Sequence, residues 1–149
     1  VVYVSIGGGG VISGIGCVLK AFSPRTRVVG VSAKNSAELA ASIRAGKMVK
    51  VDHFETLADG CAGGVDNDTI TLGLGSEVID DLIDCSEGQI EVGLQQIAWN
   101  EKMLVEGSAG LAYAAWQEGA SNNKNKISAV VLCGANFDKE TLSPIFNCE

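Results

Sequence analysis

Apolar residues follow two different periods along the chain, which predicts strands and helices in alternation. Short, nearly continuous apolar runs are typical of buried strands. In the segments between these runs, apolar residues recur every three or four positions, as in a helix that buries one face. The predicted strands cover residues 1–4, 27–31, 82–85 and 127–132.

Start and stop signals set the bounds of the predicted helices. Ser23-Pro24 ends a helix over residues 11–22, and Gly46 ends a helix that Asn35 or Ser36 caps. Residues 86–89, Ser-Glu-Gly-Gln, fit a capping box, which opens another helix. Further helices are predicted over residues 69–79, in an alanine-rich segment that stops at Gly119, and from Asp138 to a limit at Pro144, with a polar surface loop over 120–126.

Strands that alternate with helices place the chain in the α/β class. We expect a three-layer sandwich with a mainly parallel, twisted sheet, because strand-helix-strand units join parallel strands by right-handed crossovers. Residues 1–149 are expected to form a single domain, since no long linker divides them. Ligands of such sheets bind beyond the carboxyl ends of the strands, and both 7–10 and 133–136 fall there.

Four consecutive glycines, Gly7–Gly10, join the first predicted strand to the first predicted helix. At such a turn the free N–H groups and the helix dipole favour an anion, so the run predicts a phosphate cradle; the alternative is a plain flexible turn. The run lacks the Lys and Ser/Thr of a P-loop and the spacing of a G-x-G-x-x-G dinucleotide loop. The interpretation of the chain as an NAD(P)-binding domain therefore depends only on its glycine-rich start.

Charge and cysteine content narrow the partners and the compartment. A net charge of −7 with no basic cluster argues against nucleic acid and against an anionic membrane surface. The five cysteines are odd in number and lie mostly in apolar segments, which indicates reduced thiols and a cytoplasmic protein. The chain starts at Val1, within an apolar run and without a Met, so we expect it to begin inside a fold.

Four motifs in order along the chain resemble those of the fold-type II pyridoxal-phosphate enzymes. They are G-G-G-G-V-I-S-G at 7–14, T-L-A-D-G at 56–60, V-E-G-S-A-G at 105–110 and L-C-G-A-N at 132–136. Together they are similar to the serine/threonine dehydratase branch, which includes threonine ammonia-lyases and serine racemase. The resemblance implies the large domain of that fold and pyridoxal 5'-phosphate as cofactor, or a phosphate or sulfate ion in its place.

The resemblance also implies which residues bind the cofactor: Gly7, Gly8, Gly9, Gly10, Val11, Glu106 and Cys133. The glycine run matches the loop that holds the cofactor phosphate through backbone N–H groups. Cys133 matches the Ser or Cys that faces the pyridine nitrogen, and Glu106 matches a glutamate close to the ring. Without the resemblance, Cys133 would be interpreted as a buried core thiol and Glu106 as a helix cap.

The chain departs from the family at the catalytic group. Family members attach the cofactor through a Schiff-base lysine in an S-x-K motif that precedes the glycine loop, and the chain has no counterpart there. Its lysines stand in other contexts, at positions 20, 34, 47, 50, 102, 124, 126 and 139. No catalytic residue is therefore assigned. No metal site is expected either, because Ser32 stands where some relatives carry a glutamate ligand, and His53 is expected on a surface loop.

The motifs thus predict the C-terminal portion of a hydroxy-amino-acid dehydratase or ammonia-lyase, inactive without the missing lysine. The reaction of the complete enzyme would convert a serine- or threonine-like substrate to a 2-oxo acid and ammonia. The alternative is a truncated, non-catalytic module that binds phosphate or pyridoxal phosphate or serves in assembly. In either case we expect a homo-oligomer, because the missing elements would leave apolar surface exposed.

Overall fold

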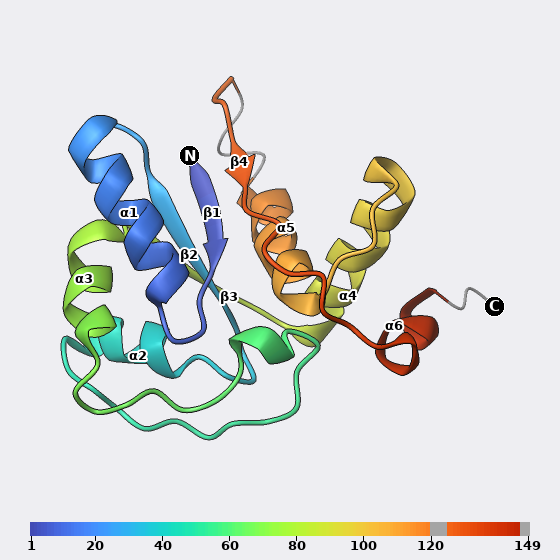
Figure 1. Ribbon diagram of the computed structural model, residues 1–149, viewed down its shortest axis with the longest axis horizontal. Helices are drawn as coiled ribbons and strands as arrows, with labels where there is room; N and C mark the ends of the chain where they lie inside the picture. The colour runs from blue at the N-terminus through green and yellow to red at the C-terminus, as the bar shows by residue number, and fades with distance from the viewer. Residues whose placement is uncertain (120–124, 147–149) are drawn as a thin grey trace.

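One parallel sheet runs through the part of the chain that the computed structural model describes, residues 1–119 and 125–146 (Figure 1). Its strands are β1 (Val2–Ser5), β2 (Val28–Ala33), β3 (Asp81–Cys85) and β4 (Ala129–Val130), in the spatial order β3-β2-β1-β4. Val2 of β1 lies opposite both Val28 of β2 and Ala129 of β4. Parallel neighbours need crossover connections, and helices supply them here.

Helices cover both faces of this sheet (Figure 1). On one face lie α1 (Gly10–Phe22), α2 (Glu38–Ala45) and α3 (Ile70–Val78); on the other lie α4 (Glu87–Gln96), its π-helical continuation η2 (Ile97–Glu101) and α5 (Gly107–Gly119). Strand residues alternate between the two faces, since Val4 and Val28 pack toward α1 whereas Tyr3 and Val29 pack toward α5. The predicted three-layer α/β sandwich is confirmed. A 3-10 turn, η1 (Asp59–Cys61), and α6 (Lys139–Phe146) complete the elements.

Three of the predicted helix signals are confirmed and one is wrong. Ser23 follows the last residue of α1 as its C-cap. Gln89 Oε1 accepts hydrogen bonds from the Ser86 N–H at 2.6 Å and the Ser86 hydroxyl at 2.9 Å, and Gly46 ends α2 with a φ of 67°. Neither Asn35 nor Ser36 caps α2, whose N-cap is Ala37. The Ser36 hydroxyl is instead bound to His53 and to the N–H of Gly63, so it is not available to the helix.

The C-terminal third departs further from the prediction. The strand expected over 127–132 shrinks to Ala129–Val130, because β4 is an edge strand with β1 as its neighbour, and Ile127 is 91% exposed. Pro144 lies inside α6 rather than ending it. Since α6 finishes at Phe146, two residues later, the missing proline N–H costs the helix a single bond near its end. Residues 120–124 of the predicted polar loop lie outside the described residues.

The alanine-rich helix α5 packs closely on α4, as its small residues predict. A Cβ at Gly93 would lie 2.6 Å from the carbonyl oxygen of Gly110, and a Cβ at Gly110 would lie 2.7 Å from Leu94 Cγ. The glycines therefore permit an approach that side chains would block. Neither α5 nor another helix in the described ranges is long and apolar enough to cross a membrane.

Candidate functional site

A cavity of about 150 Å³ lies where β1 ends and the glycine run begins. It lies at the carboxyl end of β1 and next to the segment that follows β4, where ligands of parallel sheets bind. Seven of its lining residues are the predicted site residues: Gly7, Gly8, Gly9, Gly10, Val11, Glu106 and Cys133. Four more were not predicted: Ser5, Gly60, Cys61 and Ser108.

The glycine run places backbone N–H groups at this cavity. Gly9 is the N-cap residue of α1, with a left-handed φ of 84°, and no side chain caps the helix. The first N–H groups of a helix have no partner within it, and no hydrogen bond among the described residues uses the N–H of Gly8 or Gly9. Such N–H groups and the helix dipole together favour an anion.

This turn is packed on its inner side and open on its outer side. A Cβ at Gly9 would lie 2.4 Å from Leu39 Cδ2, and a Cβ at Gly7 would lie 3.0 Å from Cys61 Cα. No heavy atom lies within 4 Å of a Cβ built at Gly8 or Gly10. The run is therefore a fixed turn with open space beside it, which is the shape of an anion site rather than of a loose connection.

The hydroxyl of Ser108 adds a polar group to the cavity. Ser108 is 3% exposed, and its Oγ has no hydrogen-bond partner in the structure. An unpaired buried hydroxyl costs free energy unless a ligand satisfies it. Burial raises the pKa of the neighbouring Cys61 thiol, so Cys61 is a neutral wall of the cavity at pH 7.

Glu106 directly precedes α5, and two glycines make room for its side chain. A Cβ at Gly134, whose φ is 109°, would lie 2.0 Å from Glu106 Oε1, and a Cβ at Gly60 would lie 3.0 Å from the same atom. The carboxylate accepts a hydrogen bond from the N–H of Asn136 at 2.9 Å. The backbone oxygen of Glu106 accepts the first bonds of α5, from the N–H of Ala109 at 3.0 Å and of Gly110 at 3.2 Å. Its carboxylate bonds to Asn136 and not to the N–H groups of α5, so the described residues do not show Glu106 as a side-chain cap.

Cys133 follows β4 and is exposed, so it is not the buried core thiol that its apolar sequence context suggested. Cys17, Cys61 and Cys85 are also free thiols. Burial raises the pKa of Cys85 to about 12, and Cys85 does not line the cavity. Of the four described cysteines, Cys61 and Cys133 therefore belong to the site.

Within residues 1–119 and 125–146, no lysine lines the cavity. Ser32-Ala33-Lys34 has the letters of the S-x-K motif, but it stands at the end of β2, after the glycine run, and Lys34 is exposed. The residues described here contain no cluster of three or more His, Cys, Asp or Glu side chains suited to a metal ion. His53 lies in the segment between α2 and η1, where its ring bonds to Glu38 and Ser36.

A larger hollow of about 580 Å³ lies beside Phe54. Its polar lining includes the carboxylates of Glu55, Asp59 and Glu87. Carboxylates repel a phosphate, whereas the cavity at the glycine run offers N–H groups at a helix N-terminus. The smaller cavity is therefore the candidate site.

Three of the four residues that were not predicted belong to segments that the sequence had already singled out. Gly60 ends the T-L-A-D-G motif, and Ser108 lies within V-E-G-S-A-G. Ser5 lies between the predicted strand over 1–4 and the glycine run, two positions before Gly7. Cys61 carries no such signal, because η1 brings it to Gly7 over more than fifty residues of chain.

The sequence profile of the family described as "Pyridoxal-phosphate dependent enzyme" matches residues 1–134. The chain belongs to this family. It is 33% identical over 146 residues to the catabolic L-threonine dehydratase of Escherichia coli K12, and 32% identical over 147 residues to the L-threonine ammonia-lyase of Thermotoga maritima. These alignments cover 97% and 99% of this chain but 44% and 36% of the two relatives.

Solved structures give the same grouping. The processed form of threonine deaminase isoform 2 from Solanum lycopersicum superposes with a TM-score of 0.87 at 26% identity, over 97% of this chain and 43% of that one. Maize serine racemase superposes with a TM-score of 0.84 at 26% identity, over 96% and 44% of the two chains. The chain thus spans about two-fifths of the length of the relatives it matches.

Proposed function

We propose that the cavity at the glycine run holds pyridoxal phosphate, with the phosphate on the N–H groups that begin α1. The observation that carries this proposal is that three unpaired hydrogen-bond donors, the amides of Gly8 and Gly9 and the hydroxyl of Ser108, lie at one small cavity. The cofactor that gives the family its name carries the anion that these donors require. The predicted residues Gly7, Gly8, Gly9, Gly10, Val11, Glu106 and Cys133 are proposed to contact it.

Each residue then has a physical task. The amides of the glycine run bind the phosphate and so fix the cofactor along the sheet edge. Cys133 offers the pyridine nitrogen a neutral thiol, which unlike a carboxylate does not hold that nitrogen protonated. Glu106, held by the N–H of Asn136, limits how far the ring can move toward η1. When bound, the cofactor supplies the electron sink that lets the α-proton of an amino acid leave.

We further propose that these residues serve the loss of water and then of ammonia from serine- or threonine-like substrates. The likeness to threonine dehydratases at 32–33% identity supports this reaction. The same reaction needs a basic amine at the cavity, and none of the lysines that the structure describes lines it. The 149 residues alone are therefore proposed to bind the cofactor without turning over substrate.

The second candidate is a module that binds the cofactor or phosphate without catalysis. It is favoured by the same cavity, which offers N–H and hydroxyl donors to an anion but is lined by none of the described lysines. The two candidates agree on binding and differ in whether a polypeptide supplying the lysine restores turnover.

Binding is tested by equilibrium dialysis of the 149-residue chain against pyridoxal phosphate, pyridoxal and inorganic phosphate. We expect pyridoxal phosphate to bind, phosphate to compete with it, and pyridoxal to bind at least tenfold more weakly. Equal binding of pyridoxal and pyridoxal phosphate would contradict the phosphate cradle. Formation of 2-oxo acid from L-threonine above a no-protein control would contradict the dependence on an external lysine.

A further inference from the structure

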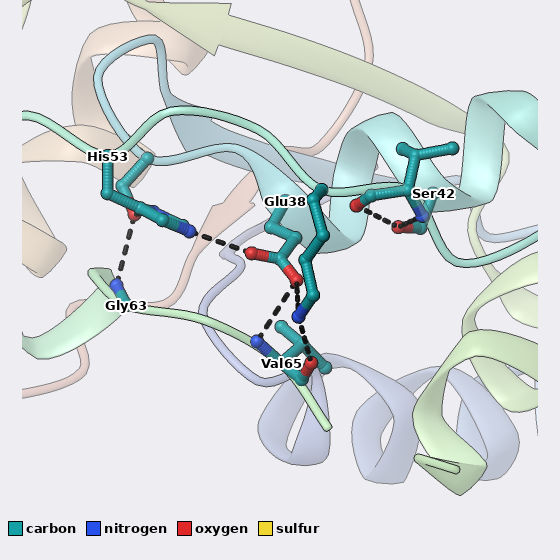
Figure 2. A network of polar contacts seen from close by, with 8 residues as sticks. Glu38, Ser42, His53, Gly63 and Val65 are labelled. Carbon is teal, nitrogen blue, oxygen red and sulfur yellow. Dashed lines mark hydrogen bonds and ion pairs between the residues drawn. The ribbon is translucent and has the colours of Figure 1, made fainter. Parts of the chain in front are cut away.

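The carboxylate of Glu38, the first residue of α2, is buried and fully bonded (Figure 2). Glu38 is 3% exposed, and water therefore does little to stabilise its charge. Its Oε1 accepts from Lys50 Nζ at 2.9 Å and from the Val65 N–H at 3.4 Å, and its Oε2 is 2.7 Å from His53 Nε2. The hydrogen bond from Lys50 is the main reason why the pKa of Glu38 is lowered.

The hydroxyl of Ser36 extends this network. Ser36 Oγ accepts from the N–H of Gly63 at 3.1 Å and lies 2.8 Å from His53 Nδ1. If Ser36 donates its proton to Nδ1, the ring proton is on Nε2 and points to Glu38, which satisfies every polar atom of a neutral ring. The order Glu38, His53, Ser36 is that of a hydrolase relay, but Ser36 is 4% exposed and offers no nucleophile to a substrate.

The residues that bond to the side chains of Glu38 and Ser36 all belong to one largely irregular segment, residues 47–66, which connects α2 to the cavity. Ser42 of α2 holds the start of this segment, because its Oγ accepts from the Val49 N–H at 3.0 Å. Glu38 and Ser36 hold it at Lys50 and His53 on one side of η1 and at Gly63 and Val65 on the other (Figure 2). The segment is thus fixed to α2 before and after η1.

The turn between these anchors forms one wall of the cavity. Gly60 and Cys61 of η1 line it, and Cys61 packs against Gly7 at the start of the glycine run. Leu39, the neighbour of Glu38 in α2, packs against the inner side of the glycine run, where it occupies the space beside Gly9. The beginning of α2 therefore contacts the cradle through Leu39 and the residues on either side of the wall through Glu38.

We propose that Glu38 is a positioning residue for the cofactor cavity: through Lys50, His53 and Val65 it holds the 47–66 segment so that η1 closes the wall at Cys61. This proposal rests on the proposed function only for the identity of the ligand. The placement of the wall is measurable without any ligand, because Cys61 is a buried thiol within it and Cys85 is a buried thiol outside it.

The test compares the 149-residue chain with Glu38→Gln, which keeps the shape and removes the charge. The matched control is Asp84→Asn, which removes one carboxylate from the ion pair with Arg44 of the same helix but leaves the segment untouched. The rate of alkylation by iodoacetamide is measured by mass spectrometry at Cys61 and Cys85, and pyridoxal phosphate affinity is measured by dialysis.

We expect Glu38→Gln to raise the Cys61 rate at least tenfold with Cys85 unchanged, and to weaken pyridoxal phosphate binding at least fivefold. Asp84→Asn should change the Cys61 rate and the affinity by less than twofold, and only Cys85 should react faster, because the charge of Asp84 helps to raise the pKa of that thiol. A parallel rise at both thiols would mean global destabilisation and would overturn the proposal, as would no rise at either. If Glu38→Gln does not fold, Lys50→Met replaces it in the test, because the Lys50 side chain is 66% exposed and its loss leaves no cavity in the core. Lys50→Met should then raise the alkylation rate of Cys61, and Lys50→Arg, which keeps the charge, should return it to that of the parent chain. Failure of the parent chain to bind cofactor would count against the proposed function alone, because the thiol rates still decide the positioning role.

Discussion

Replacement of Gly8 by Asp is the sharpest probe of the glycine run. A Cβ at Gly8 meets no heavy atom within 4 Å, and Gly8 does not have a left-handed φ, so the fold has room for the new side chain. Its carboxylate would lie beside the unpaired N–H groups that begin α1. The substitution therefore places a negative charge where the cofactor phosphate is proposed to bind, without disturbing the packed inner side of the turn.

The expected loss follows from Coulomb's law. Two like unit charges about 5 Å apart repel by about 3 kcal/mol at an effective dielectric constant of about 20. Salt and movement of the exposed side chain reduce this to about 1.5–3 kcal/mol, which weakens binding by about 10- to 100-fold. Dialysis against pyridoxal phosphate at two salt concentrations measures the loss and its screening.

Gly14→Asp is the matched control for this substitution. Gly14 is exposed on the same helix, also has open space for a Cβ, and does not line the cavity. At 1.5 Å of rise per residue it lies about 6 Å along the axis beyond Gly10, where α1 begins. We expect it to change affinity less than threefold. If Gly8→Asp binds pyridoxal phosphate as tightly as the parent chain does, the phosphate is not held by this run.

Three further outcomes follow from the packing and charges. Gly110→Ala should destabilise the fold by about 1–3 kcal/mol in urea unfolding, because its Cβ would lie 2.7 Å from Leu94 Cγ; an unchanged midpoint would show that α4 and α5 separate freely. The pKa of Glu38 is lowered in the folded state, so its charge stabilises the fold above the usual Glu pKa of 4.5, and this contribution is lost as the pH falls through the lower folded value. The difference in free energy of unfolding between the parent chain and Glu38→Gln should therefore shrink from pH 7 to pH 3. A constant difference would exclude the charge of Glu38 as its cause. Val18 and Phe22 of α1 are 59% and 86% exposed, so light scattering at micromolar concentration should detect an oligomer, and a monodisperse monomer would contradict this expectation.

The sequence allowed the position of the glycine turn to be predicted because its signal is contiguous. Four glycines between a strand and a helix are visible without knowledge of the fold, and the parallel order of the strands places Cys133 near them. The capping box at Ser86 is equally local. These features depend on residues a few positions apart, where spacing and conformation are directly linked.

The remaining features depend on contacts between distant residues. Glu38 stands where an ordinary acidic residue of a first helical turn would stand. No neighbouring residue in the sequence indicates that Lys50 and His53 will bury its side chain. Cys61 reaches Gly7 only because the 47–66 segment folds back across the sheet edge. The length of β4 likewise depends on its place at the edge of the sheet, beside β1. Such outcomes are set by tertiary packing, which overrides local propensity.

The charges at the cavity also determine which way a cofactor is expected to lie. Two helices, α1 and α5, begin there, and each offers the positive end of its dipole. At α5 this end is already compensated, because the carboxylate of Glu106 stands directly before the helix. At α1 the N-cap is a glycine without a side chain, so its N–H groups have no anion of their own. A phosphate therefore gains most at α1, which leaves the space between Glu106 and Cys133 for the ring.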